Sequence, residues 1–479
     1  MARVLLPPAG TSAARVRPAD LAEALGVAWD AGWNGPVRLL DTADRRLRTA
    51  GWYLMTLPGR TVLRDHDGGE ETVAEGAPGP VPGAADRWPV GPVRERLRAL
   101  AGRRALLVVA EGDGEGGSAR PGRGTMVRWA RLRIGRMDRL WLESTGTRRM
   151  DPLLAVGWRT APSHPTADLT APAPLPTLVP PDATRSAQRA LTDLVRAVLA
   201  RLADLEPGIR DDLDDGFLHE HRVLLRRARA LAGQFRHAWS DGAATDLRTT
   251  LAEWQRRTNR LRDLDVWLAQ GPEPRLPAAL EPGWQSLHAA LTAERATAQA
   301  ACATALADPR HGAARERLLA QAGEPGSGAE SRTPIGRLAA RRTWRAYRVA
   351  ADAARAIGPD STAEAVHGVR LACKKLRYLA EYAGPLMAPD AWPDLRDDLR
   401  RLQDGLGAFN DGAVQRDGIL DLARRMGGPP EALLAAGAVA AIRQRALDEA
   451  RAGLADGLAE LAAESTRRRW RGAFRSAEA

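Results

Sequence analysis

Cysteine and aromatic residues are scarce in this 479-residue sequence, and each scarcity argues against a class of protein. The two cysteines, Cys302 and Cys373, are too few for the disulfide framework of a small secreted domain, and this usage is typical of a reducing cytoplasm. Aromatic residues make up 5% of the chain, which is low for a binder of single-stranded nucleic acid, because such proteins stack bases on aromatic rings. The sequence therefore predicts a cytoplasmic protein for which nucleic acid is an unfavoured partner.

Long apolar segments and catalytic motifs are also missing. The longest apolar run, 432–442, is too short to span a bilayer and is typical of a core helix, so we expect no membrane partner. Residues 1–8 are too short for a signal peptide and are interrupted by proline. The sequence contains no glycine-rich phosphate loop ending in Lys-Ser or Lys-Thr, and no cysteine and histidine cluster for a metal. We therefore expect no catalytic residue, no metal ligand and no cofactor.

One basic pattern occurs twice and contains the only two lysines of the chain. The pattern His-x-x-Arg-x-x-x-basic-basic-x-Arg is found at 219–229 and again at 367–377, an offset of 148 residues. Lys374 and Lys375 stand where the first copy has Arg226 and Arg227, so either basic side chain serves there. Together with the net charge of +11, this doubled cationic pattern favours an anionic partner.

The offset of 148 residues recurs along the C-terminal part of the chain. It relates Arg295 to Arg443, for example, as well as the two basic patterns. This spacing is far longer than the about 20–50 residues of solenoid repeats. It therefore predicts two similar helical subdomains, at 187–334 and 335–479, rather than a stacked array.

Each copy of the pattern predicts a helix with one cationic face. At about 100° per residue, the basic positions fall within an arc of roughly 80°, and apolar residues lie opposite. The first row is His219, Arg222, Arg226 and Arg229, and the second row is His367, Arg370, Lys374 and Arg377. A solvated helix face usually mixes charge signs, whereas neither row contains an acidic residue. Each row is either a solvated surface or, as we favour, the contact surface for an acidic segment or an external anion.

Four segments together resemble the CHAD domain, the conserved histidine α-helical domain. They are the two basic patterns, Arg262–Val266 and Leu402–Asp411, and the resemblance spans about 185–479. It implies an antiparallel helical bundle with internal pseudo-symmetry that binds inorganic polyphosphate in a basic channel. Some members of this family are located at polyphosphate granules. Because this ligand carries charge but no bases, it suits arginine forks and lysine point charges without stacking platforms.

The repeat and the resemblance identify a set of candidate polyphosphate-binding residues. They are His219, Arg222, Arg226, Arg227, Arg229, Arg295, Arg341, Arg345, Arg348, His367, Arg370, Lys374, Lys375, Arg377, Tyr378 and Arg443. The three arginines at 341–348 share a helix face and correspond to an aspartate and two alanines in the first repeat, so the second repeat should be more basic. The two histidines either carry a charge facing the anion or orient their neighbours while neutral. The run Arg467–Arg471 either extends the groove or forms a solvated end.

Asp263 and its counterpart Asp411 need a separate explanation, because a carboxylate would repel phosphate. We expect each aspartate to fix a neighbouring arginine or histidine, or to cap a helix. Metal ligation is the alternative, and no neighbouring residues favour it.

Residues 1–158 differ from the rest of the chain. Short strand-like runs separated by turn residues predict a mainly antiparallel β domain. These runs are 37–40, 51–57, 105–110, 125–134 and 139–143. Seven prolines between 162 and 181 predict a linker at 159–184. The expected fold class is therefore α+β multidomain, with a β-rich domain before an all-α, duplicated helical bundle at 185–479.

The segment Leu40–Gly51 resembles a strand and turn of the CYTH family. Members of that family form a β-tunnel that binds triphosphate and metal, and they often precede a CHAD domain. The family's Glu-x-Glu-x-Lys strand is absent here, and the strand after Gly51 reads Leu-Met-Thr-Leu at 54–57 rather than basic. A tunnel of this kind needs carboxylates to hold the divalent metal and basic side chains to hold the triphosphate. In these strands only Arg131 and Arg133 share a face that suits a phosphate contact. We expect a degenerate CYTH-like domain without hydrolytic activity.

Three functions follow from these features. The leading one is non-catalytic binding of inorganic polyphosphate, with association with polyphosphate granules and their proteins. The second is hydrolysis of triphosphate or polyphosphate by the CYTH-like domain. The third is nucleic-acid binding.

Overall fold

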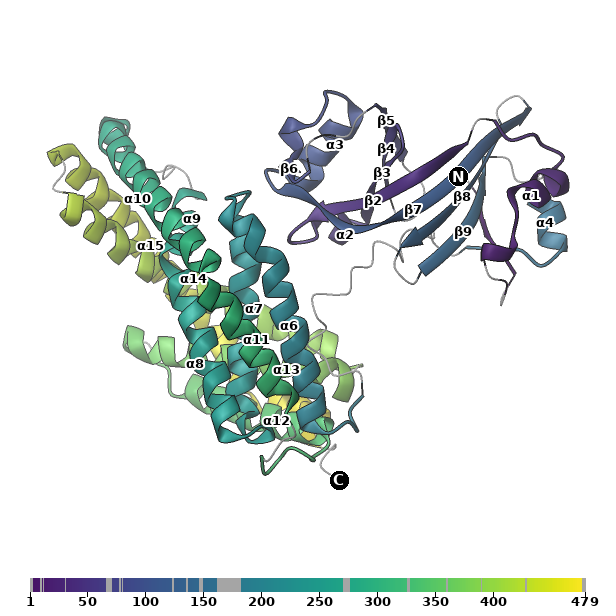
Figure 1. Cartoon of the computed structure of the whole chain (residues 1–479). Helices are drawn as coiled ribbons and strands as arrows, with labels where there is room; N and C mark the ends of the chain where they lie inside the picture. Colours follow the sequence, from purple (N-terminus) through teal and green to yellow (C-terminus); the bar gives the residue numbers. More distant parts are fainter. Residues whose placement is uncertain are drawn as a thin grey trace. The chain divides into compact units, whose positions relative to one another are not determined.

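The computed structural model divides the chain into two compact units, Met1–Pro174 and Leu175–Ala479 (Figure 1). It describes residues 3–8, 11, 13–30, 32–65, 71–76, 79, 81–122, 125–134, 137–145, 150–161, 182–269, 276–324, 328–358, 361–388, 390–426 and 429–475. Residues 162–181, and with them most of the predicted linker, lie outside the described residues. Within the described residues, no helix is both long and apolar enough to cross a bilayer.

The N-terminal unit is built on one antiparallel sheet of ten strands. The strands are β1 Arg3–Leu6, β2 Trp33–Thr42, β3 Trp52–Leu57, β4 Arg60–Asp65, β5 Glu71–Glu75, β6 Gly83–Ala84, β7 Ala105–Gly122, β8 Thr125–Ile134, β9 Met137–Ser144 and β10 Arg159–Thr160. Their order is β10-β1-β9-β8-β7-β2-β3-β4-β5, and β6 also pairs with β7. The prediction of an antiparallel β domain is confirmed. Strand β10 pairs with β1, so the sheet continues past residue 158 into the segment predicted as linker.

Helices and side chains cover the two faces of this sheet differently. On one face Val127, Leu140 and Leu142 pack with helices α1 Pro18–Leu25 and α4 Asp151–Ala155. On the other face Tyr53 and Leu132 belong to a separate apolar cluster. Two further helices, α2 Arg46–Thr49 and α3 Pro92–Ala101, pack against the end of the sheet that carries β3 and β4. Alternate residues of each strand therefore meet different surroundings.

The C-terminal unit is entirely helical in its described part, as predicted. The first repeat contains α6 Ala187–Arg210, α7 Asp215–Gln234, α8 Asp241–Arg257, α9 Asn259–Ala269, α10 Glu281–Ala307 and α11 Pro309–Gly323. The second contains α12 Ile335–Arg355, α13 Ala363–Met387, α14 Trp392–Met426, α15 Pro430–Ala462 and α16 Glu464–Arg475. Helices α10 and α15, which correspond to each other, lie side by side (Figure 1). Leucines and tryptophans of α9, α10 and α14 share one core with alanines and Val439 of α15.

Backbone hydrogen bonds relate the two repeats by the offset read from the sequence. The amide of Ala187 donates to the carbonyl of Thr333 over 2.8 Å, and the amide of Ile335 donates to the carbonyl of Arg185, also over 2.8 Å. Each donor and each acceptor is 148 positions from its counterpart. The starts of α6 and α12 are therefore joined as a pseudo-symmetric pair, as expected for an internal repeat.

The two helices with basic patterns begin in the same way. The Asp214 side chain accepts a hydrogen bond from the amide of Gly216 at the start of α7. The Thr362 side chain accepts one from the amide of Ala365 at the start of α13. Such N-terminal caps satisfy amides that have no partner within the helix, and they fix where each cationic row begins.

Candidate functional site

The first cationic row is anchored at a break between two helices. Arg222 is 8% exposed, and its Nη1 donates to the Gln255 carbonyl, Thr258 Oγ1 and Asn259 Oδ1 over 3.2, 2.9 and 2.8 Å. Helix α8 ends at Arg257, where carbonyls lose their partners within the helix. Arg222 therefore joins α7 to the α8–α9 junction, and its predicted place on an open cationic face is wrong.

Burial has an electrostatic consequence for Arg222. It lowers the pKa of this guanidinium to about 10, and the nearby charge of Arg226 acts in the same direction. The carboxylate of Asp263 partly offsets both effects. Asp263 is thus placed near a basic side chain, as the sequence suggested, whereas the side chain of Asp411 lies outside the described part of the structure.

Other basic side chains surround the outer part of the first row. Arg229 donates from Nη1 to Gln255 Oε1 over 2.5 Å. Its pKa is lowered by burial and then by the charges of Arg248 and Arg256 on α8. The sequence prediction missed these two arginines because it considered only the patterned helices. Arg229, Arg248 and Arg256 therefore form a like-charged cluster between α7 and α8. Arg226 lies on the same helix as Arg229 and has no hydrogen bond or ion pair within the described residues, and its charge acts on Arg222.

The second row lies on α13, and one carboxylate links it to Arg227 of α7. Arg370, Lys374 and Arg377 are half-buried, whereas His367 and Lys375 are exposed. A carboxylate oxygen of Glu381 lies 3.6 Å from Arg377 Nε. Its other oxygen lies 3.2 Å from Arg227 Nη2 on α7. The sequence analysis did not predict Glu381. Helices α7 and α13 are therefore neighbours, and their rows belong to one region.

Tyr378 is placed differently from the other predicted residues of α13. It is 7% exposed, and the guanidinium carbon of Arg377 lies 5.3 Å from its ring centroid. A cation above an aromatic face is held by the ring quadrupole. The buried Tyr378 ring therefore supports the Arg377 guanidinium, and Tyr378 is not a separate surface contact for the ligand.

The two repeats hold their rows in different ways. The residues that correspond to Thr258 and Asn259 are Leu406 and Gly407, within the unbroken helix α14. The side-chain acceptors of Arg222 therefore have no counterpart for Arg370. Arg248 corresponds to Arg396 but Arg256 corresponds to Asp404, so one of the two charges that α8 adds to the first row is reversed in the second repeat.

Arg295 is held by carboxylates, contrary to its prediction as a phosphate ligand. Its Nη1 and Nη2 donate to the two oxygens of Asp212 over 2.7 and 2.6 Å, and its Nε donates to Asp265 over 2.8 Å. The hydrogen bonds to Asp212 raise the pKa of Arg295. Three of its five N–H donors are used within the fold, so this arginine joins α10 to α9 and to the α6–α7 turn. The counterpart Arg443 is half-buried on α15.

The family of this chain follows from the family model that its sequence matches. The model of the CHAD domain matches residues 176–420, which is more than half of the chain. The chain belongs to the CHAD-domain family. No curated protein matches it.

Several solved structures are similar to the chain at low identity. A CHAD domain from the plant Ricinus communis is 23% identical with a TM-score of 0.49, and the match covers 58% of this chain and 93% of that one. PptA from Streptomyces chartreusis is 17% identical with a TM-score of 0.44, over 57% and 99%. A Bacillus halodurans structure described as an adenylate cyclase is 14% identical with a TM-score of 0.23, over 32% and 84%. These likenesses carry no functional argument.

The predicted arginines of α12 lie on an exposed face of the CHAD domain. Arg341 donates from Nη2 to Glu330 over 2.6 Å, a carboxylate that it shares with Arg342. Arg345 and Arg348 are exposed and have no hydrogen bond or ion pair within the described residues. In the tail, Arg469 pairs with Asp398 over 2.7 Å, so the tail run is not a continuous free row.

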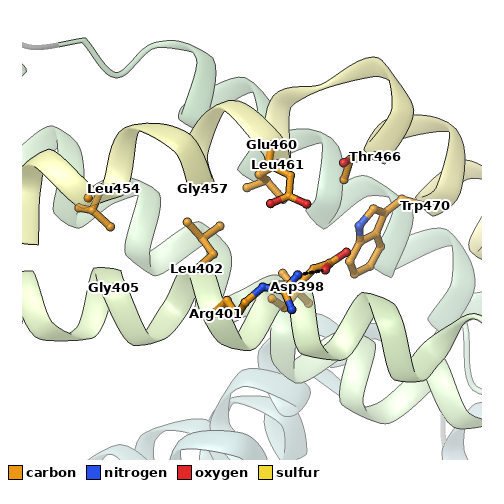
Figure 2. A pocket seen from close by; sticks show the side chains of 12 residues that line it. Asp398, Arg401, Leu402, Gly405, Leu454, Gly457, Glu460, Leu461, Thr466 and Trp470 are labelled. Carbon is orange, nitrogen blue, oxygen red and sulfur yellow. Dashed lines mark hydrogen bonds and ion pairs between the residues drawn. The ribbon is translucent and has the colours of Figure 1, made fainter.

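A pocket of about 250 Å³ lies between α14, α15 and α16, but its lining does not suit a polyanion. Figure 2 shows leucines and Trp470 around it, with Asp398, Arg401 and Glu460 nearby. Arg401 donates to Asp398 over 2.5 Å, as the dashed line marks. The lining therefore has no excess of positive charge, and the rows of α7 and α13 remain the candidate site.

A buried ionic cluster supports α7 from behind the first row. Glu206 on α6 accepts a hydrogen bond of 2.8 Å from His311 Nε2 and one from Arg315, and His221 Nε2 lies 3.9 Å away. Burial alone would raise the pKa of Glu206, but these partners outweigh it and lower the pKa. The pKa of His221, which has no exposed surface, is lowered by burial. This cluster, which the sequence analysis missed, holds α6, α7 and α11 together.

Proposed function

We propose that the chain binds inorganic polyphosphate through the rows of α7 and α13, without chemical conversion. The observation that carries this proposal is the like-charged cluster of Arg229, Arg248 and Arg256 on α7 and α8, in a row that also includes Arg226. A flexible chain of phosphates would relieve that repulsion at several positions at once. Arginines offer planar forks to phosphate oxygens, and Lys374 adds a point charge in the second repeat.

Membership of the CHAD-domain family supports the same ligand, because the family is linked to polyphosphate. The rows also offer little for a nucleic acid to stack on, since Tyr378 is buried beneath Arg377. Nucleic-acid binding is the alternative within the same surface. Competition at fixed salt separates the two: long polyphosphate should displace DNA from the chain, and DNA should not displace polyphosphate.

Binding of long polyphosphate should depend steeply on salt. Each cation that meets the ligand releases condensed counterions, so affinity should fall on the order of 300-fold between about 50 and 200 mM salt, as for about six neutralised phosphates of a single-stranded polyanion. The measurement is a series of titrations with polyphosphate of one length, using the full chain and residues 185–479 alone. An affinity that stays flat over this range would contradict the proposal for the helical unit.

The N-terminal unit is proposed to be catalytically silent. Within its described residues there is no group of three or more side chains able to hold a metal. Incubation of the full chain with tripolyphosphate and Mg²⁺ or Mn²⁺ should therefore release no more phosphate than a buffer control. Metal-dependent release that disappears when residues 1–158 are removed would establish the enzymatic alternative instead.

The cellular role that follows is association with polyphosphate granules and with the proteins on them. A fluorescent fusion of the full chain should co-localise with granules, and residues 185–479 should suffice. The corresponding fusion with alanine at Arg226, Arg229, Arg370 and Lys374 should be diffuse. Granule association that survives these changes would place the targeting signal elsewhere in the chain.

A further inference from the structure

A cavity of about 280 Å³ lies on one face of the N-terminal sheet, and the proposed polyphosphate site does not involve it. Its walls include residues of β2, β3, β4, β5, β7, β8 and β9. Four arginines and two glutamates line it, so its lining has two more positive than negative charges. These residues are Arg60, Arg64, Arg120, Arg128, Glu71 and Glu143.

Both glutamates are already engaged by arginines. Arg64 Nη1 donates to the two oxygens of Glu143 over 2.8 and 2.9 Å, and Trp141 Nε1 donates to the same carboxylate over 2.9 Å. Arg128 Nη1 donates to the two oxygens of Glu71 over 3.0 and 3.2 Å. A divalent metal takes several free oxygen ligands, so this lining does not fit the metal and triphosphate that the CYTH resemblance implies.

Unused donors remain in the cavity after these pairs are made. Within the described residues, no hydrogen bond or ion pair engages the side chains of Arg60 and Arg120, both of which line the cavity. Burial and the charge of Arg128 lower the pKa of Arg60. A bound anion would supply a charged acceptor for both guanidinium groups.

The remaining wall is aromatic and fits a flat group. Trp33, Tyr53 and Trp141 line the cavity. A Cβ atom at Gly114 or Gly116 of β7 would come within 2.9 or 2.5 Å of the Trp33 indole. Glycine at these positions therefore makes room for the indole. Such a wall adds apolar and stacking contacts that inorganic phosphate cannot use.

We propose that this cavity binds, without metal, a phosphomonoester with a small flat apolar body. The phosphate would meet Arg60 and Arg64, with Arg120 at the exposed edge, and the body would lie against the aromatic wall. A phosphomonoester carries about 1.5 to 2 negative charges at neutral pH, which matches the excess of two positive charges. A triphosphate carries more charge than this lining can neutralise, and the volume is near the lower end for ligand sites.

Calorimetric titration of the full chain with phenyl phosphate in the presence of EDTA tests this inference. Arg60→Gln and Arg120→Gln should each weaken binding by about tenfold or more, because each removes a charge-assisted contact. Arg133→Gln is the matched control: it also removes one positive charge, but strand alternation places it on the face opposite Leu132 and the cavity. Its affinity for phenyl phosphate should equal that of the unchanged chain.

Several results would overturn the inference. These are absence of binding, a requirement for Mg²⁺ or Mn²⁺, equal affinity for inorganic phosphate, or equal weakening by Arg133→Gln. Arg226→Ala distinguishes binding by the helical unit: phenyl phosphate binding lost in this variant would assign the ligand there. Thermal unfolding is measured for each variant, and if Arg60→Gln does not fold, the exposed Arg120 decides the question. None of these results tests polyphosphate binding by α7 and α13, which is a separate proposal.

Discussion

Replacing Arg370, Lys374 and Arg377 with alanine is expected to weaken polyphosphate binding on the order of 100-fold or more, because each positioned, charge-assisted contact contributes about 1–3 kcal/mol. These side chains lie on one helix whose apolar face is buried, so their geometry is fixed before the ligand arrives. The measurement is affinity for polyphosphate of one length at fixed ionic strength. Losses of this size would identify α13 as part of the binding surface.

The control for this variant is replacement of Arg467, Arg468 and Arg469 with alanine. It removes the same charge from the chain, but two of these arginines already pair with Glu464 and Asp398. The control should therefore lose much less affinity, and equal losses in the two variants would contradict the assignment. Thermal unfolding of the α13 variant should hold, because Arg227 still neutralises Glu381. Its unfolding would show that the row is structural.

Replacing Glu206 with alanine is expected to lower the free energy of unfolding by about 3–5 kcal/mol, because it removes the acceptor of the buried His311 and leaves the Arg315 guanidinium without its carboxylate. Glu206 is 6% exposed and interacts with His221, His311 and Arg315. Glu253→Ala is the matched control, since that glutamate forms a surface ion pair with Arg257, worth about 0–1 kcal/mol. Urea unfolding measures both variants. Similar small losses in the two would show that the buried cluster does not stabilise the fold.

The same cluster makes the free energy of unfolding depend on pH. Because the folded-state pKa of His221 is lowered, the unfolded chain binds more protons below about pH 6.5, and stability should fall as the pH drops. The pKa of Glu206 is also lowered, so its contribution is present above its unfolded pKa of about 4.3 and is lost on further acidification. The second repeat has Ala354 and Val369 at these positions. The double variant Glu206→Ala with His221→Val should therefore show a weaker loss of stability from pH 7 to 5, and an unchanged pH profile would exclude these groups as its cause.

The sequence predicted the repeat and the helical fold because both depend on local pattern. The offset of 148 residues reappears in the hydrogen bonds that join Ala187 to Thr333 and Ile335 to Arg185. The strand at 125–134 was predicted residue for residue, because its alternation is strong. By contrast, β4 was missed, and with it Arg60 and Arg64 of the cavity.

The errors concern arginines whose partners are distant in the sequence. A helical wheel shows which side of α7 carries Arg222 but not that the α8–α9 junction covers it. Likewise, the repeat relates Arg295 to Arg443, but it does not reveal Asp212, which is 83 residues away. Arg131 is another case: it donates to Asp138 over 2.8 and 2.5 Å, so it does not remain as a phosphate contact. Burial and long-range pairing decide which cations are available, and pattern alone contains neither.

The most direct test of polyphosphate binding by the rows uses the rarity of lysine in this chain. Lys374 and Lys375 are its only lysines, so an amine-reactive label followed by mass spectrometry reports on α13 and on no other side-chain amine. With saturating polyphosphate, labelling of Lys374 should slow by about tenfold or more, because an adjacent anion favours the unreactive ammonium form by about one pKa unit. Labelling of the chain's N-terminal amine provides the internal control. An unchanged labelling rate at Lys374 with polyphosphate bound would contradict the account.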